Sequence, residues 1–269
     1  MLNLHGKVVL ITGLGQTTDE GWGIGAAIAT LFARQGAAIF GGNRSLTSAN
    51  RTKARIEEEG GICHVVETDV TDSASVKALV DQCIQRHGRI DILVNNVGRS
   101  EPGCPASMTE DTWHAQVDIN LNSLYLLTHH VLPIMTQQGH GSVVSVASIA
   151  GLRYIGKPQV AYSATKAAMI QFAKATAVMY ARQNIRLNTV VPGLIYTPYT
   201  EALAQRYAPG KIQRGICRLG KSRFLWGEWG MDGMWHGRRC SLRRMRRVIL
   251  QGSLWWWMGG SLVLLGEYN

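Results

Sequence analysis

The stretch Lys7-Val8-Val9-Leu10-Ile11-Thr12-Gly13, close to the start of the chain, decides the fold. Its short apolar run is typical of a buried strand in a parallel sheet. The run enters a glycine-rich loop, Gly13-Leu14-Gly15 and later Gly21-Trp22-Gly23-Ile24-Gly25, and a helical stretch follows from Ala26 to Gln35. A strand, a glycine turn and a helix N-terminus together form a phosphate site, because free backbone N–H groups and the helix dipole both favour an anion. The sequence therefore predicts a phosphate site rather than a merely flexible loop.

Apolar runs continue this pattern along the chain. They alternate with helical stretches at Val8–Ile11, Ala37–Phe40, Cys63–Val66, Ile90–Val94, Val143–Val146 and Leu187–Val191. The alternation predicts an α/β fold, a Rossmann-like doubly wound parallel sheet with helices on both faces. The 269 residues are ample for one such domain and its core. We expect this domain to span residues 1–210, and residues 211–269 to form a tail that is not a separate domain.

A second stretch, Tyr162-Ser163-Ala164-Thr165-Lys166, points to chemistry. Positions four apart lie on one helix face, so Tyr162 and Lys166 can point into one site. A phenol titrates at about pH 10, but a nearby ammonium stabilises the phenolate and lowers that pKa toward neutrality. Ser148 could hold a substrate oxygen while a proton passes to or from Tyr162. The three residues suit the interconversion of an alcohol and a carbonyl, although the Tyr-Lys spacing alone also occurs on helices whose lysine is simply solvated.

In this order, the motifs resemble the short-chain dehydrogenase/reductase family from about Leu4 to Gly210. Asn95-Asn96-Val97-Gly98 is similar to the family's Asn-Asn-Ala-Gly element, with Val97 in place of alanine. The resemblance implies an oxidoreductase that interconverts a secondary alcohol and a ketone with NAD(P)(H). Tyr162 would be the general acid/base, and Lys166 would lower its pKa and bind the nicotinamide ribose. Ser148 would orient the carbonyl, and Asn120 would anchor a proton-relay water.

The resemblance also implies where the cofactor lies. Asp69-Val70 matches the contact to the adenine ring, and Pro192-Gly193-Leu194-Ile195-Tyr196-Thr197 resembles the segment that grips the nicotinamide amide. The expected cofactor-binding residues are Gly13, Gly15, Gly23, Ile24, Gly25, Asn43, Arg44, Ser45, Asp69, Val70, Asn96, Gly98, Tyr162, Lys166, Pro192, Gly193, Ile195 and Thr197.

The first glycine loop departs from the family pattern. Nine residues separate Gly13 from Gly23, where the family usually has three. The inserted residues, 16–21, are polar, and we expect them to bulge outward without moving the helix N-terminus. The sequence leaves open which of Gly13, Gly15 and Gly21 touches the pyrophosphate.

Cofactor choice is read at the end of the second strand, where an acidic residue would bind the ribose 2′-hydroxyl of NAD and repel a 2′-phosphate. This chain has Asn43, Arg44 and Ser45 there. A guanidinium can hold a phosphate with two hydrogen bonds, so we expect NADP(H) to be preferred, with NAD(H) as the alternative. In that alternative, Arg44 is a solvated loop residue that only stacks on the adenine.

Other features place the protein more broadly. The five cysteines are scattered without metal-ligand spacing, and their odd number argues against a disulfide framework. Gly6 and Lys7 lead straight into the first strand, so the N-terminus is not a signal peptide. We expect His129, His130 and His140 at surface or helix-end positions. We expect a cytoplasmic protein without a metal site, and a homo-oligomer by resemblance. The substrate loop, Leu194–Pro209, contains Tyr196, Tyr199, Leu203 and Tyr207. These side chains suggest a hydrophobic fatty-acyl, polyketide, terpenoid or steroid carbonyl, as in secondary metabolism.

The last 59 residues, Lys211–Asn269, differ from the rest. They carry eleven Lys and Arg against three acidic residues, hence +8 of the chain's +10, and six of its eight tryptophans. Three interpretations compete: a nucleic-acid-binding tail, a basic flank with a membrane segment at Val248–Gly266, or a frameshift product. The membrane segment is a poor one, because it contains Gln251, Ser253 and several glycines. We expect neither a nucleic-acid nor a membrane partner.

The genetic code favours the frameshift. Trp and Met have one codon each, so Trp255-Trp256-Trp257-Met258-Gly259 is encoded TGG TGG TGG ATG GGN. If reading instead starts at the third base of each of these codons and runs on into the codon of Gly260, the bases are GTG GTG GAT GGG NGG. They encode Val-Val-Asp-Gly and then Gly, Arg or Trp. Val-Val-Asp-Gly-Gly resembles the family's closing strand and turn. In the same frame, Met234-Trp235-His236 gives Val-Ala, and the codons between permit a family-like last helix. The frame would switch near Gly210-Lys211.

Such a tail has structural consequences. In the family, the replaced segment supplies the last helix and a strand of the sheet, and a missing strand would leave an edge prone to aggregation. We expect the tail to offer no strand pattern in exchange. A second hypothesis follows, in which the chain is a catalytically impaired dinucleotide-binding protein.

Overall fold

The protein forms one Rossmann-like domain around a parallel sheet. The structure, a computed structural model, describes residues 3–18, 21–195, 197–200 and 203, and the backbone of 254–258 and 261–264. Between residues 3 and 195, this sheet has six parallel strands, β1 (Val8–Thr12), β2 (Ala38–Asn43), β3 (Ile62–Glu67), β4 (Ile92–Asn95), β5 (Gly141–Val146) and β6 (Ile185–Pro192). They lie in the order β3-β2-β1-β4-β5-β6. The order reverses between β1 and β4, and ligands of open α/β sheets bind beyond the carboxyl ends of strands at such a point.

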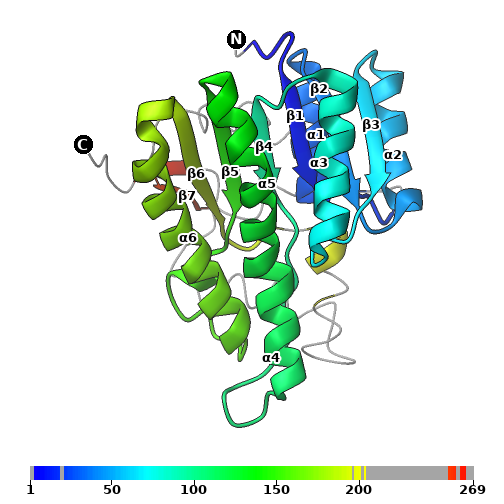
Figure 1. The fold of residues 1–269 in the computed structure, drawn as a ribbon. Helices are drawn as coiled ribbons and strands as arrows, with labels where there is room; N and C mark the ends of the chain where they lie inside the picture. Colours follow the sequence, from blue (N-terminus) through cyan, green and yellow to red (C-terminus); the bar gives the residue numbers. More distant parts are fainter. Residues whose placement is uncertain are drawn as a thin grey trace.

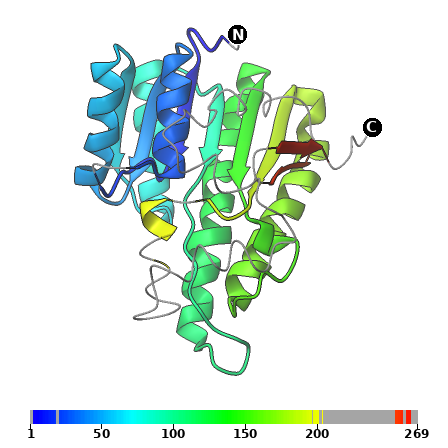
Figure 2. The ribbon, with the colours of Figure 1, turned by 180° about the vertical axis from the view of Figure 1, so that it is seen from behind.

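Helices cover both faces of the sheet. Helices α1 (Ile24–Arg34) and α2 (Leu46–Glu58) lie on one face, and α3 (Ser73–His87), α5 (Ser123–Gln138) and α6 (Val160–Tyr180) lie on the other (Figures 1 and 2). Helix α4 (Glu110–Val117) extends beyond the sheet and enters α5 through a π-helical turn, Asp118–Asn122. Short 3-10 turns occupy Ile149–Gly151 and Ala181–Gln183.

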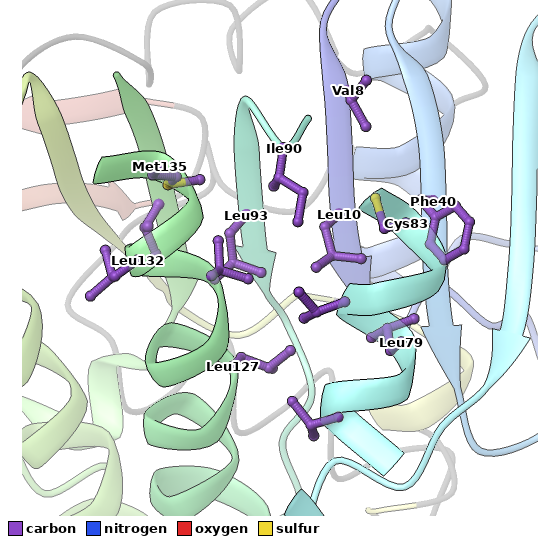
Figure 3. Close-up of a cluster of buried hydrophobic side chains, with 14 of the residues drawn as sticks. Val8, Leu10, Phe40, Leu79, Cys83, Ile90, Leu93, Leu127, Leu132 and Met135 are labelled. Carbon is purple, nitrogen blue, oxygen red and sulfur yellow. The ribbon is translucent and has the colours of Figure 1, made fainter. Parts of the chain in front are cut away.

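Two apolar clusters hold these layers together, and alternation along β1 separates them. Val8 and Leu10 belong to the cluster that α3, α5 and α6 cover, part of which Figure 3 shows. Val9 and Ile11 belong to the cluster under α1 and α2. All four residues are at most 5% exposed. Because both faces are buried, the strand reads as a continuous apolar run, as the sequence predicted.

The expectation for the tail was wrong at one point. The structure pairs a tail strand, β7 (Leu254–Met258), parallel with β6, with Thr189 opposite Leu254 and Pro192 opposite Trp257. A further strand, β8 (Ser261–Leu264), pairs antiparallel with β7. The prediction failed because it required an alternating or buried strand pattern, whereas aromatic residues also have high strand propensity. The strand is the same segment whose other frame encodes Val-Val-Asp-Gly. Among the described residues, no helix is long and apolar enough to cross a membrane.

Candidate functional site

The glycine loop brings three backbone segments close together at the carboxyl end of β1. A Cβ atom on Gly25 would lie 2.1 Å from the carbonyl oxygen of Gly13, and one on Gly15 would lie 2.4 Å from Ser48 Oγ. Gly13 itself has φ +72°, a conformation that L side chains rarely adopt. Only glycine fits these positions, because a side chain there would clash with neighbouring atoms or strain the backbone. The absence of side chains lets the loop backbone lie close to the start of α1.

The N-terminus of α1 is suited to an anion. Gly23 is its N-cap, no side chain of the described residues caps it, and its first turn contains no acidic residue. The first backbone N–H groups of a helix have no intrahelical acceptor, and the helix dipole is positive at that end. This glycine cradle therefore fits the pyrophosphate of a dinucleotide.

The predicted cofactor-choice residues have distinct surroundings. The Asn43 carboxamide accepts a hydrogen bond from the Gly15 N–H at 3.1 Å and donates to the Ser45 carbonyl at 2.8 Å. It ties the end of β2 to the glycine loop. Ser45 caps the N-terminus of α2 by accepting from the Ser48 N–H. Both side chains are thus engaged with the backbone, while Arg44 between them is exposed.

The Arg44 charge acts on the Asp69 carboxyl. The pKa of the Asp69 carboxyl is below its usual range, mainly because Thr71 donates hydrogen bonds from its hydroxyl and its N–H, with a smaller contribution from the Arg44 charge. Val70 is 4% exposed and packs into the core cluster under α3. The structure therefore places Val70 in the core, and Asp69 with its side chain held by Thr71.

The segment after β4 links the glycine loop to α6. The Asn96 side chain donates a hydrogen bond to the Gly13 carbonyl at 2.9 Å. A Cβ atom on Gly98 would lie 2.9 Å from Lys166 Nζ. Gly98 therefore leaves the space that the lysine side chain occupies.

Tyr162 and Lys166 lie on one face of α6, as their spacing predicted. Lys166 is 2% exposed, and its Nζ donates to the Val146 carbonyl at 2.9 Å. Burial lowers its pKa to about 7. The same Nζ lies 5.6 Å from the centre of the half-buried Tyr162 ring. The phenol and the ammonium thus share one site.

Ser148 follows the end of β5, beside a turn that contacts α6. It starts the 3-10 turn Ile149–Gly151, and its Oγ accepts from the Ala150 N–H at 3.2 Å. That turn packs tightly on α6, since a Cβ atom on Gly151 would lie 2.6 Å from the Lys166 carbonyl carbon. The packing holds β5 and α6 in fixed relation.

Asn120 lies in the π-helical turn between α4 and α5 and is fully buried. Its side chain accepts from the Arg99 N–H at 3.0 Å and donates to the carbonyls of Arg99 and Gln116, each at 2.9 Å. A single π turn inside a helix often marks a functional position. Here it directs the Asn120 carboxamide at the backbone that follows β4.

The segment after β6 lies partly outside the described residues. Pro192 ends β6, and Thr197 is 6% exposed, with its N–H donating to Thr200 Oγ1 at 2.7 Å. The Tyr199 hydroxyl accepts from the Ser100 N–H at 3.2 Å, which joins this segment to the chain after β4. Tyr196, Tyr207 and most of the predicted substrate loop lie outside the described residues, whereas Gly193 and Ile195 are described as half-buried.

One residue near the site was not predicted. Gln16, placed by the sequence in an outward bulge, is 1% exposed and bonds to Gly21 and Gly23. No signal in a single sequence distinguishes it from a solvated glutamine. In the described part of the chain, no group of three or more His, Cys, Asp or Glu side chains is placed to hold a metal ion.

Known proteins match this chain over most of its length. A family model for short chain dehydrogenases matches residues 7–208. The 3-oxoacyl-[acyl-carrier-protein] reductase FabG of Thermotoga maritima is 36% identical, over 82% of this chain and 87% of that protein. A crystal structure from Burkholderia xenovorans, described as a short-chain dehydrogenase/reductase, is 43% identical, covers 81% of this chain and 82% of its own, and has a TM-score of 0.78. A 7α-hydroxysteroid dehydrogenase complexed with NADH is 30% identical, over 74% of this chain and 75% of its own, with a TM-score of 0.69.

Proposed function

We propose that this chain, which belongs to the short-chain dehydrogenase family, interconverts a secondary alcohol and a ketone on a hydrophobic small molecule with NADP(H) or NAD(H). The observation that carries the proposal is the shared site of Tyr162 and Lys166 on α6. The buried ammonium lies 5.6 Å from the phenol ring and directly beside the position of Gly98. A group that exchanges protons thus stands next to the cradle that fits a dinucleotide.

In the proposed mechanism, each side chain has one task. When bound, the nicotinamide supplies or accepts the hydride. The Tyr162 hydroxyl gives a proton to the carbonyl oxygen, or removes one from the alcohol. The Lys166 ammonium favours the phenolate form of Tyr162 and binds the nicotinamide ribose. Ser148 holds the substrate oxygen by a hydrogen bond, and Asn120 anchors the proton relay from its π-helical turn.

For the cofactor, we propose a preference for NADP(H). No carboxylate stands at the end of β2 to repel a 2′-phosphate, and the Asn43 side chain is bonded to Gly15 and Ser45. Arg44 is the exposed cation at that position. The relative solved with NADH supports the other choice, so both cofactors belong in the test. Arg44→Ala should weaken NADPH binding at least about tenfold and change NADH binding less, as titrations of cofactor fluorescence would measure.

For the substrate, we propose an apolar carbonyl compound. Tyr199 stands 42% exposed beside the chain that follows β4. One relative is named for reducing a 3-oxoacyl chain, and another for a hydroxysteroid. Turnover on a panel of 3-oxoacyl thioesters, steroid ketones and polar ketones tests the proposal. Activity confined to polar ketones would contradict it.

A second candidate is a dinucleotide-binding protein with impaired catalysis. It is favoured by the end of the family match at residue 208, which leaves the basic tail outside the family pattern. Saturable NADPH or NADH binding without turnover on the whole panel would support this candidate against the first. We further propose that the protein is cytoplasmic, because its five cysteines are scattered and odd in number. We also propose a homo-oligomer, since Tyr125 on α5 and Val178 and Met179 on α6 are 51%, 80% and 72% exposed.

A further inference from the structure

The lengthened glycine loop is closed by one buried side chain. Gln16 Oε1 accepts a hydrogen bond from the Gly23 N–H at 2.8 Å, and Gln16 Nε2 donates to the Gly21 carbonyl at 3.1 Å. The side chain thereby bridges the two ends of the insertion. Because Gly23 is the N-cap of α1, this carboxamide reaches the helix end that fits the pyrophosphate.

Helix α2 also holds the glycine loop, through hydrogen bonds to its backbone. The Gln16 N–H donates to the Ser48 carbonyl at 2.9 Å, Arg51 donates to the Thr17 carbonyl at 2.7 Å, and Thr52 donates to the Leu14 carbonyl at 2.7 Å. The guanidinium of Arg55 lies 4.8 Å from the centre of the Trp22 ring. The four α2 residues are spaced i, i+3, i+4 and i+7, so they form one stripe along one face of the helix.

We propose that Gln16 is a positioning residue for the dinucleotide, which lets a loop with nine residues between Gly13 and Gly23 present the same helix N-terminus as a loop with three. The α2 stripe holds the outer part of the loop, and the Gln16 carboxamide fixes the part that faces α1. Without the buried Gln16 side chain, the Gly21 carbonyl and the N–H of the half-buried Gly23 lose these hydrogen bonds, and the loop end shifts. This inference rests on the proposed dinucleotide binding.

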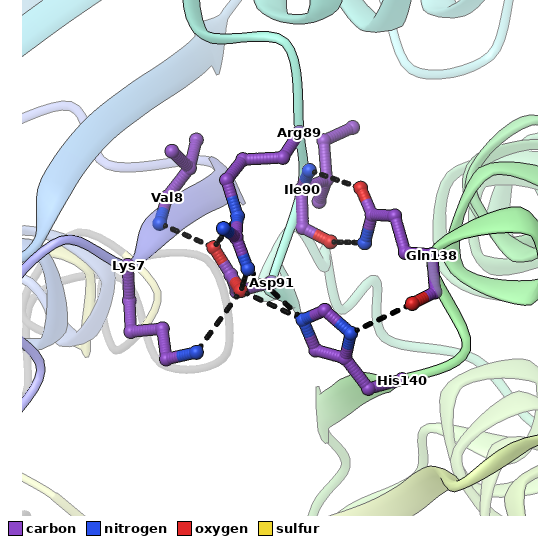
Figure 4. Close-up of polar contacts among 7 residues, drawn as sticks. All are labelled: Lys7, Val8, Arg89, Ile90, Asp91, Gln138 and His140. Carbon is purple, nitrogen blue, oxygen red and sulfur yellow. Dashed lines mark hydrogen bonds and ion pairs between the residues drawn. The ribbon is translucent and has the colours of Figure 1, made fainter.

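The chain offers a matched control. Gln138 makes the same pair of bonds with Ile90, accepting from its N–H and donating to its carbonyl, each at 2.9 Å (Figure 4). It lies at the C-terminus of α5, where the strands begin, and so at the end of the sheet opposite the glycine loop. Substitution by methionine removes two equivalent hydrogen bonds in both places and keeps the side-chain length.

The test measures binding of NADH and NADPH to the full chain by fluorescence, with urea unfolding alongside. Gln16→Met should raise the Kd about tenfold or more, whereas Gln138→Met should change it less than twofold, although both variants unfold at lower urea. An unchanged Kd in Gln16→Met, or an equal rise in both variants, would overturn the proposal. Failure of the unsubstituted chain to bind either cofactor would contradict the proposed function as well.

If Gln16→Met does not fold, a second variant still tests the proposal. Gln16→Glu keeps the acceptor for the Gly23 N–H and adds a negative charge at the α1 N-terminus. It should weaken ADP-ribose binding more than tenfold and adenosine binding less than threefold, because only ADP-ribose carries the pyrophosphate. Equal loss for both ligands, or no loss, would show that Gln16 does not set the phosphate end of the site.

Discussion

Lys166 combines a cost for folding with a role in the proposed site. Its ammonium is 2% exposed, and burial lowers its pKa to about 7, compared with about 10.4 in an unfolded chain. The folded state therefore binds this proton less tightly than the unfolded state does. The buried charge opposes folding fully below pH 7, and the cost disappears as the pH rises toward 10.4.

Replacement of this lysine should separate stability from activity. We predict that Lys166→Met raises the free energy of unfolding at pH 6 by roughly 1–3 kcal/mol, because it removes a buried charge. The gain should shrink as the pH approaches 10, and turnover should fall at least about a hundredfold. Urea unfolding between pH 6 and 10 measures the first effect. A variant that is less stable than the parent at pH 6 would contradict the burial argument.

At the scale of the elements, a carboxylate joins the starts of three strands. The Asp91 side chain is 3% exposed and accepts hydrogen bonds from the Val8 N–H and Arg89 Nε, both at 2.9 Å, and His140 Nε2 lies 3.0 Å from its Oδ1 (Figure 4). Lys7 adds a fourth contact at 3.3 Å. Burial alone would raise the pKa of this carboxyl, but its hydrogen bonds to Arg89, Val8 and His140 outweigh burial and lower the pKa to about 2.

The Asp91 cluster should account for most of the fall in the free energy of unfolding at acid pH. Because the folded pKa lies below the unfolded value of about 3.9, the stabilisation is complete above pH 4 and is lost as the pH falls toward 2. We predict that Asp91→Asn lowers the free energy of unfolding at pH 7 by about 2–4 kcal/mol, because the cations around it lose their counter-charge. At pH 3, the difference in the free energy of unfolding between Asp91→Asn and the parent should be smaller. An equal loss at both pH values would argue for a packing defect instead.

The sequence predicted the elements better than their contacts. The six apolar runs became β1 to β6 with small changes at their ends, because parallel strands buried on both faces have an unmistakable composition. The approach of Lys166 to Gly98 follows from motifs at strand and helix ends. The burial of Gln16 and the bonds of Asn43 to the glycine loop could not be predicted, since both depend on how a polar insertion folds back. The strand Leu254–Met258 was missed because the tail has no alternating or buried strand pattern, on which the prediction relied.

At the scale of the whole molecule, the family pattern covers the first part of the chain and stops before the basic tail. The family match ends at residue 208, close to the proposed frame switch at Gly210-Lys211. We propose that the tail is a frameshifted reading of the family's own last helix and strand. The strand that pairs with β6 lies in the segment whose other frame encodes Val-Val-Asp-Gly.

Restoring the frame should therefore restore the enzyme. Sequencing of the transcript across the codons for Arg206 to Arg214 should reveal one base more than the sequence that encodes the tail, because that base is missing relative to the frame that ends in Val-Val-Asp-Gly-Gly. We predict that the frame-restored product is more soluble than the 269-residue chain and turns over carbonyl substrates faster. A transcript that encodes the tail, together with a soluble and fully active 269-residue protein, would contradict the frameshift.

The most direct test of the central claim is the comparison of Tyr162→Phe with its parent, in the 269-residue and frame-restored chains. Turnover on the carbonyl panel and the Kd for NADPH and NADH are measured on the same preparations. The variant loses one hydroxyl and keeps the ring beside Lys166. We predict that turnover falls at least about a thousandfold while the Kd changes less than threefold. Retained turnover, or parallel loss of turnover and cofactor binding, would contradict Tyr162 as the proton donor.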